Sequence, residues 1–400
     1  MVHNVRPTTL LVLGTFTFVV TTSALSLFSI KQSKKKAVKW PRREKLPRDL
    51  ETWKFLVIED YMDAWNELRP LLAQHNLELW RTTIGQQLWE HDLPPHGDNF
   101  LYLTTHDTPN KSLVNWCRFS VLTACLHHAA RMDGIRDVVL RVVSLSAGDT
   151  GQTHLRIIKR LTSPPDQLLS SNHILPILQE IYFEDIVIIA VPKLIYNVRE
   201  VLRYRKSNSV EDALYMVVQA FEATAYIHQK FIAHRDLYLP NFMVEWMPES
   251  LSKRTTVARP RVYMIDFETA VDFPPDSLEA DRVCTKFHRD LDQFGRYIAP
   301  ELRTKEPYCP FKLDMWQLGE DLRINLVTGL DEVDGLWQAL CMPNPQDRMN
   351  ADTALKTLDD YLRKTPSIDL HREILDPLDA NEPFFYITEH IDFPPRPLKY

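Results

Sequence analysis

The sequence is short of glycine and cysteine, and each shortage limits what the protein can be. Its 400 residues include five cysteines, an odd number at wide spacing with no Cys-x-x-Cys pair. This pattern argues against a disulfide framework or a zinc site and suits a reducing compartment. No large excess of positive charge is present either, because the formal net charge is -6. We therefore expect no nucleic-acid partner, and any basic character that matters must be local.

The remaining composition is that of an ordinary globular chain. Apolar residues make up 44% of the sequence and charged residues 25%, which is enough apolar material to form a core. A chain of this length exceeds one small domain and suits a two-lobed unit with extensions.

An uncharged segment at residues 8–30 is long enough to cross a bilayer as a helix. A dense group of basic residues follows it, namely Lys31, Lys34, Lys35, Lys36, Lys39, Arg42, Arg43 and Lys45. By the positive-inside rule, this asymmetry predicts a single-pass membrane anchor within residues 1–30, with the folded domain facing the cytoplasm. The alternatives are a cleaved signal peptide, with small residues at positions 22–24, and a peripheral or mitochondrial presequence.

Residues 31–98 are expected to form a basic juxtamembrane linker followed by a helical extension. The apolar spacing over 50–80 is helical, with an interruption at Pro70, and the two prolines and the glycine within 91–98 mark a boundary.

Beyond this boundary the pattern predicts an α+β arrangement of two lobes. A β-hairpin is expected over 126–144, with its turn at Asp133 and Gly134. A helix is expected over 151–163, a buried strand over 185–192, and a helix over 209–229 that Ser209 caps together with Asp212. We assign residues 99–192 to a small strand-rich lobe, 193–365 to a larger helical lobe, and 366–400 to a C-terminal tail.

Two short motifs bring together the residue types that phosphoryl transfer needs. His234, Arg235 and Asp236 are followed five residues after the aspartate by Asn241, and Asp266 precedes Phe267 further along the chain. One carboxylate can accept the proton of an attacking hydroxyl, while a second carboxylate and an amide oxygen can hold magnesium.

These motifs resemble the catalytic loop and the metal-binding segment of eukaryotic protein kinases. Three later motifs match the same family in the expected order: YIAPEL at 297–302, DMWQLG at 314–319, and a late segment whose Arg348 would pair with Glu301. The extended N-terminal region more loosely resembles large fungal families of kinase-like proteins. Aminoglycoside- and choline-type phosphotransferases share the spacing of the first motif but are not expected to have both YIAPEL and DMWQLG.

The resemblance implies a bilobal protein-kinase-like fold with ATP and Mg²⁺ as cofactors. It implies that Asp236, with Arg235 beside it, is the catalytic residue, and that Asn241 and Asp266 are the metal ligands. Arg141 would contact the α and β phosphates of ATP. Lys193 and Leu194, in the hinge at 191–194, would bind adenine through their backbone.

The small lobe departs from the kinase pattern at each part of its nucleotide clamp. No two glycines lie two residues apart, so the phosphate-covering loop is missing. Arg141 stands where the family has a lysine, and no lysine occurs between Lys111 and Lys159. His154 falls at or near the position of the glutamate that would pair with that lysine, and the predicted helix around it has no acidic residue.

The large lobe also departs from the pattern. Glu268 replaces the glycine after Asp266 and Phe267, which adds negative charge beside the metal site. Tyr238 and Pro240 occupy the positions where serine/threonine kinases and tyrosine kinases, respectively, have a basic residue in the catalytic loop. Phe294 lies where the activation segment of a serine/threonine kinase usually has a threonine.

Two functions of different classes remain. One is a membrane-anchored, ATP-dependent protein kinase with a protein substrate and an impaired rate, because positioning and electrostatics supply most of the catalysis. The other is a pseudokinase that acts as a scaffold or regulator of a protein partner.

Overall fold

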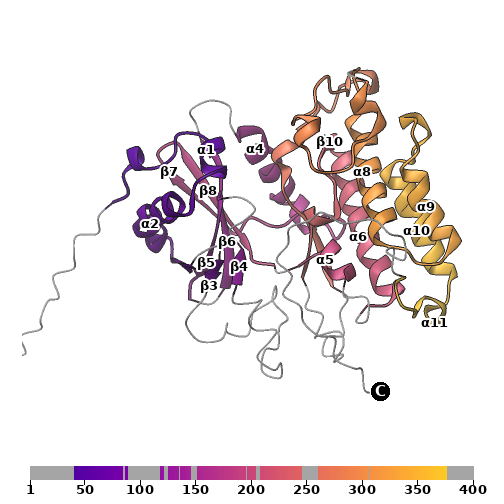
Figure 1. Cartoon of the computed structure of the whole chain (residues 1–400), viewed down its shortest axis with the longest axis horizontal. Coiled ribbons are helices and arrows are strands. Elements are labelled where there is room, and N and C mark those ends of the chain that lie inside the picture. Colours follow the sequence, from indigo (N-terminus) through magenta and orange to yellow (C-terminus); the bar gives the residue numbers. More distant parts are fainter. Residues whose placement is uncertain are drawn as a thin grey trace, which may run out of the picture. The chain divides into compact units, whose positions relative to one another are not determined.

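The computed structural model describes residues 40–83, 86–88, 118–120, 125–134, 136–145, 151–194, 196–203, 208–245, 260–304 and 306–375. The chain divides into Met1–Trp40 and Pro41–Tyr400, and the elements below all belong to the second unit (Figure 1). The predicted membrane anchor at 8–30 lies outside the described residues. Among those that are described, no helix is both long and apolar enough to span a bilayer.

Two helices precede the small-lobe sheet, α1 (Leu50–Lys54) and α2 (Ile58–Gln74). α1 begins at Asp49, whose carboxylate accepts a hydrogen bond of 2.7 Å from the backbone nitrogen of Thr52. The helical prediction for 50–80 is confirmed for these two helices but is wrong beyond Gln74. There Asn76 adopts a left-handed backbone with φ of 58°, which ends the helix and starts a strand.

A five-stranded antiparallel sheet forms the small lobe, in the order β1-β5-β6-β8-β7. Its strands are β1 (Leu77–Leu79), β5 (His127–Met132), β6 (Arg136–Leu145), β7 (Gln179–Phe183) and β8 (Ile186–Pro192). The predicted hairpin is β5 and β6, and its turn has positive φ at both Asp133 and Gly134. The predicted buried strand is β8. We placed the start of the small lobe near residue 99, and β1 lies before this point.

A second sheet of three strands lies between β1 and β5 in the sequence. It consists of β2 (Arg81–Thr83), β3 (Gln86–Leu88) and β4 (Arg118–Ser120). The buried side chain of Gln87 joins it to its neighbours, since its oxygen accepts a 2.5 Å hydrogen bond from the Ala129 backbone nitrogen and its nitrogen donates to the Tyr61 hydroxyl. The connection from β1 to β5 therefore contains a small sheet of its own.

The predicted helix after the hairpin is α4 (Gln152–Thr162), which packs against β6 and against the 3-10 turn η5 (Phe267–Thr269). It begins at Gly151, where φ is 82° and a Cβ atom would lie 2.0 Å from the carbonyl oxygen of Val143. Only glycine fits this close approach. α4 therefore touches both the small-lobe sheet and the segment that follows Asp266.

The longer helices in the described part of the large lobe are α6 (Val210–Gln229), α8 (Pro310–Asn325), α9 (Asp331–Leu340) and α10 (Ala351–Lys364) (Figure 1). The predicted cap of α6 is present, because Ser209 and Asp212 exchange backbone and side-chain hydrogen bonds. α8 and α9 approach closely at Gly319, where a Cβ atom would lie 2.4 Å from the Cβ of Leu340. The apolar faces of these helices share one core with α4 and β8.

Short strands pair the segments that connect the helices of the large lobe. β9 (Tyr196–Asn197), β11 (Phe242–Glu245) and β12 (Arg261–Met264) form one antiparallel sheet, and β10 (Ile232–Ala233) pairs with β13 (Val271–Asp272). The remaining helical pieces among the described residues of both lobes are α5 (Val198–Arg203), α11 (Ser367–Leu370), η1 (Arg43–Lys45), η3 (Asp166–Leu168), η4 (Leu239–Asn241), η6 (Glu279–Asp281), η7 (Leu291–Gln293), η8 (Pro300–Arg303) and η9 (Pro345–Asp347). A strand-rich small lobe and a helical large lobe together confirm the bilobal kinase-like α+β fold.

The beginning of the predicted tail packs on the large lobe. The Val210 backbone nitrogen at the start of α6 donates to the Arg372 oxygen at 2.8 Å, and the Leu375 nitrogen donates to the Val327 oxygen at 3.0 Å. Residues 376–400 lie outside the described part of the chain.

Candidate functional site

A buried carboxylate on α8 fixes the loop that follows β10. Asp314 accepts hydrogen bonds from the backbone nitrogens of His234, at 2.8 Å, and Arg235, at 2.6 Å. The same carboxylate accepts a third hydrogen bond of 2.9 Å from the imidazole of His228. Arg235 needs this support because its backbone is left-handed, with φ of 66°. The guanidinium of Arg235 then donates to the carbonyl oxygen of Lys286 at 2.8 Å, so it holds the later segment instead of facing the reacting groups.

The loop places Asp236 and Asn241 in direct contact. The amide nitrogen of Asn241 donates to the carbonyl oxygen of Asp236 at 2.7 Å and to its carboxylate at 3.1 Å. Burial raises the pKa of the Asp236 carboxyl, although the nearby guanidinium of Arg296 opposes the shift. Because the amide nitrogen of Asn241 is bound to Asp236, its amide oxygen is the atom that a magnesium ion would use.

Asp266 follows β12 in a left-handed conformation with φ of 66°. Its position is fixed by its neighbour Ile265. The backbone nitrogen of Ile265 donates to the backbone carbonyl oxygen of Asn241 at 2.9 Å, and the carbonyl oxygen of Ile265 lies 2.9 Å from the His234 imidazole. These backbone contacts bring the two proposed metal ligands beside each other. Oδ1 of Asp266 and Oδ1 of Asp236 are both buried, and carboxylate oxygens are ligands that a hard cation such as magnesium prefers.

Arg141 on β6 meets Asp266 across the two lobes. Its Nη2 atom lies 2.9 Å from Oδ1 of Asp266 and 3.1 Å from Oε2 of Glu268. Burial alone would raise the pKa of the Asp266 carboxyl, but the guanidinium of Arg141 holds that pKa well below its usual range. The carboxylate is therefore charged at neutral pH, and a guanidinium already faces it.

His154 lies on α4, close to Arg141, and is buried. Burial, with Arg141 adding to the effect, lowers the pKa of its imidazole well below the usual value, so the ring is neutral at pH 7. As the sequence predicts, α4 has no carboxylate that could pair with the guanidinium of Arg141. Glu268 provides one from the opposite lobe.

Sequence reasoning missed two cations of the site. The ammonium group of Lys54, at the end of α1, forms an ion pair with Oε1 of Glu268. The guanidinium of Arg296, in the activation segment, lies 3.1 Å from Oδ1 of Asp236 and 4.6 Å from the centre of the Tyr238 ring. No motif marks either residue, and only the fold brings them to the carboxylates.

Arg296 supplies a positive charge near the loop at 234–241, which lacks the basic residue expected there. Tyr238 stands at one of the positions where that residue is expected. Its hydroxyl donates to the backbone carbonyl oxygen of Tyr297 at 2.8 Å. This contact holds the backbone beside Arg296 against the loop. The activation segment thus brings a positive charge to Asp236 that the loop itself lacks.

The predicted hinge lies at the end of β8. The backbone nitrogen of Lys193 donates to the Asp137 oxygen at 3.1 Å, and its side chain is buried with the ammonium 5.1 Å from the centre of the Trp80 ring. Leu194 is also buried. Since the Lys193 amide is bound within the sheet, adenine binding at this segment stays a prediction.

An ion pair between Arg348 and Glu301 supports the large lobe. The guanidinium of Arg348 makes two hydrogen bonds to Glu301, at 2.6 and 2.8 Å, and its side chain is fully buried. It also donates to the carbonyl oxygens of Met342 and Lys312. This is the pair that the sequence predicts, and it anchors the end of the activation segment.

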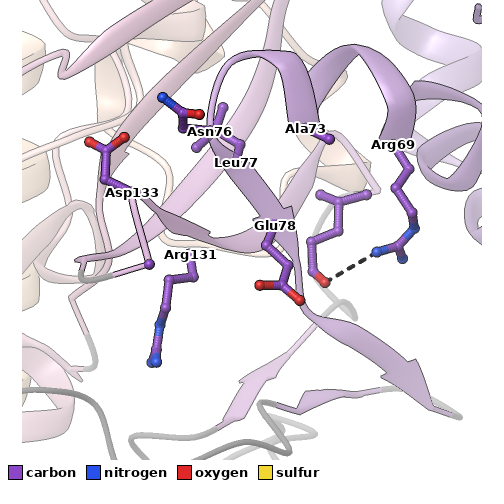
Figure 2. Close-up of a pocket in the computed structure, with 9 residues that line it drawn as sticks. Arg69, Ala73, Asn76, Leu77, Glu78, Arg131 and Asp133 are labelled. Carbon is purple, nitrogen blue, oxygen red and sulfur yellow. Dashed lines mark hydrogen bonds between the residues drawn. The ribbon is translucent and has the colours of Figure 1, made fainter. Parts of the chain in front are cut away.

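A hollow of about 690 Å³ lies elsewhere, where α2 meets β1 and the β5–β6 turn (Figure 2). Its charged lining consists of Arg69, Glu78, Arg131 and Asp133. Arg69 donates to the Leu79 carbonyl oxygen at 3.4 Å. None of the predicted site residues lines this hollow.

Within the described residues, no group of three or more His, Cys, Asp or Glu side chains is placed to hold a metal ion.

Comparisons with known proteins agree with this geometry. The family model described as the protein kinase domain matches residues 167–331, a range that contains the catalytic loop, Asp266 and the Glu301 segment but begins after Arg141 and α4. The serine/threonine-protein kinase ppk8 of Schizosaccharomyces pombe (strain 972 / ATCC 24843) is 33% identical over 105 residues, which cover 25% of this chain and 17% of that protein. The chain therefore contains a eukaryotic protein-kinase-like domain, and the matched range includes β7 and β8 of the small lobe and the large lobe as far as the start of α9.

Proposed function

We propose that this protein is a membrane-anchored protein kinase that transfers phosphate from ATP to protein hydroxyls at a reduced rate. The proposal rests chiefly on one observation, the contact between Asn241 and Asp236 beside the buried oxygen of Asp266. A base and two oxygen ligands for magnesium lie together, which is the arrangement that phosphoryl transfer requires.

Each residue has a defined part in this reaction. Asp236 accepts the proton of the substrate hydroxyl, and burial favours this role because it raises the pKa of the carboxyl and so makes it a stronger base. Asn241 and Asp266 hold magnesium, which neutralises charge on the phosphates when it is bound. Arg141 and Arg296 contribute positive charge from two sides of the site.

The reduced rate follows from how Arg141 is engaged. Its guanidinium faces Asp266 and Glu268, so contact with a phosphate requires it to share or exchange these partners. No pair of glycines covers the phosphates, and the hinge amide of Lys193 is already bound. Looser positioning of the reacting groups lowers the rate even where nucleotide binds.

The second candidate is a pseudokinase that acts as a scaffold or regulator. The ion pair between Arg141 and Asp266 favours it, because a guanidinium stands where the charge of a metal ion would otherwise act on the carboxylate. In this alternative the pair joins the two lobes and no phosphate is transferred.

The anchor at 8–30 and the cytoplasmic orientation remain part of the proposal. Of the basic residues that follow the segment, three are engaged on the small lobe: Arg42 and Lys45 with Glu67, and Arg43 with Asp185. These ion pairs fix residues 42–45 on the folded domain.

Transfer of radiolabelled phosphate from ATP to a peptide library containing serine, threonine and tyrosine tests the proposal on the full-length protein. We expect slow, magnesium-dependent labelling that Asp236→Asn abolishes. Asp290→Asn is the matched control, because the sequence has a second His-Arg-Asp string at His288, Arg289 and Asp290, and Asp290 is exposed. Labelling that is absent in the wild type, or equal in wild type and Asp236→Asn, would favour the pseudokinase.

A further inference from the structure

The short helix α1 belongs to the N-terminal extension, yet it ends at the nucleotide site. Its one turn is held by apolar packing, because Trp53 is fully buried and meets Trp65 of α2 edge-on with ring centres 5.9 Å apart. Leu50 is buried in the same cluster with residues of β5, β6 and β8. The helix therefore has a fixed place on the small lobe, although it is too short to be stable alone.

The residues before α1 are fixed as well. The guanidinium of Arg43 binds the carboxylate of Asp185, in the turn between β7 and β8, through two hydrogen bonds. Arg42 binds Glu67 of α2 through its side chain at 3.2 Å and its backbone nitrogen at 3.0 Å. Ion pairs at one end and tryptophan packing at the other thus orient Lys54, the last residue of α1.

Lys54 completes a row of four alternating charges, and its ammonium also lies 3.9 Å from the exposed carboxylate of Glu51. Its ammonium pairs with Oε1 of Glu268, Oε2 of Glu268 pairs with Arg141 at 3.1 Å, and Arg141 pairs with Asp266 at 2.9 Å. The side chains are between 11% and 37% exposed, so water screens these interactions only in part. With Lys54 present the row is neutral, and without it the row has one uncompensated negative charge.

That charge would act on the nucleotide in two ways. Glu268 would bind Arg141 more strongly and hold its guanidinium away from the phosphates. Negative charge would also remain beside a site that must accept the phosphates of ATP, and like charges so close repel.

We infer that Lys54 is a positioning residue of the nucleotide site, which the N-terminal extension supplies to balance Glu268 and leave Arg141 available to phosphate. The inference rests on the proposed function, since it requires that the site binds magnesium and ATP. Lys54 touches no substrate itself and acts through Glu268. The extension is in this way a part of the site as well as a link to the anchor.

The test measures the Kd of magnesium and ATP by calorimetry on the full-length protein. We expect Lys54→Met to raise the Kd by about threefold to tenfold, the range for a partly exposed pair coupled to its neighbours. Lys54→Arg should restore most of the affinity because it keeps the charge. Lys45→Met is the matched control, since Lys45 lies in the same segment and pairs with Glu67 at 3.6 Å, away from the site.

Glu268→Gln separates positioning from structure. With the charge of Glu268 removed, Lys54→Met should change the Kd by less than about twofold, because there is nothing left for Lys54 to balance. An equal loss of affinity in the presence and absence of the Glu268 charge would overturn the inference, and so would a Lys54→Met protein that binds like the wild type. A wild type that binds no nucleotide would instead overturn the proposed function.

Discussion

Arg141 and Asp266 are joined across the two lobes, with Nη2 of the arginine 2.9 Å from Oδ1 of the aspartate. The sequence resemblance to protein kinases predicts that the arginine stands at the position of the kinase lysine and the aspartate at the position of a metal ligand. Glu268 contacts the same guanidinium atom at 3.1 Å and so takes the part of the carboxylate that α4 lacks. The described ion-pair partners of Arg141 therefore come from the large lobe.

Arg141→Ala should abolish the rise in melting temperature that magnesium and ATP produce, since the described part of the site has no other small-lobe cation paired to Asp266. Arg141→Lys should retain a weaker rise, because an ammonium cannot face two carboxylates with the planar fork of a guanidinium. Differential scanning fluorimetry measures both. Unchanged stabilisation in Arg141→Ala would contradict the role given to this residue.

The double change Arg141→Lys with His154→Glu tests whether the site is a degraded but active one. It restores the lysine and the carboxylate of the kinase pattern, and His154 is close enough to Arg141 for the two charges to interact. Phosphate transfer by the double variant should exceed that of either single variant. If the double variant is inert while it still binds nucleotide, the pseudokinase account gains support.

Arg296→Met should slow phosphate transfer by about tenfold with little change in the Kd for ATP, because Arg296 faces the catalytic base and not Asp266. Arg289→Met is the control, since Arg289 is an exposed cation of the same segment. Measured kcat and KM separate the two effects. An equal loss in both variants would show that only the net charge of the segment matters.

Arg348→Ala should lower the free energy of unfolding by about 3–5 kcal/mol, because it leaves Glu301 without its buried partner. Lys356→Ala removes an exposed ion pair with Asp360 one turn along α10, and should cost less than about 0.5 kcal/mol. Urea denaturation of both proteins gives the comparison. Similar losses would mean that the Glu301 pair is not the anchor described above.

We expect the buried carboxyl of Glu245 to make the free energy of unfolding depend on pH. Burial raises the pKa of its carboxyl to about 7, against an ordinary value near 4.5 in the unfolded chain. Between these values the folded protein binds more protons than the unfolded one, so the free energy of unfolding falls as pH rises from about 4.5 to 7. Glu245→Gln should remove this slope and stabilise the protein at pH 8 by up to about 3 kcal/mol. Urea melts at pH 5 and 8 measure it, and the same slope in both proteins would refute the assignment.

Much of the large lobe could be predicted from the sequence, because its motifs are local. The spacing of Asp236 and Asn241 lies within one loop, and the pairing of Glu301 with Arg348 follows once the order of the motifs is known. The β5–β6 hairpin was equally accessible, since Asp133 and Gly134 specify its turn.

The charges that complete the site could not be predicted in this way. Lys54 lies 214 residues from Glu268 in the sequence, and no spacing rule joins the end of a one-turn helix to a loop of the other lobe. Arg296 replaces a loop cation from a different segment, so the sequence showed only the absence at Tyr238. The strand at 77–79 was missed because the helical apolar pattern continues past Asn76, where the backbone turns.

The most direct test of the account is the affinity of the full-length protein for ATP with and without magnesium, measured by calorimetry. Asp266 and Asn241 offer oxygen ligands while Arg141 is shared between carboxylates, so we predict weak binding that requires magnesium and that Asp266→Asn removes. Binding that is equally strong without magnesium, or that survives Asp266→Asn unchanged, would contradict the assignment of the metal site and with it the proposed phosphoryl transfer.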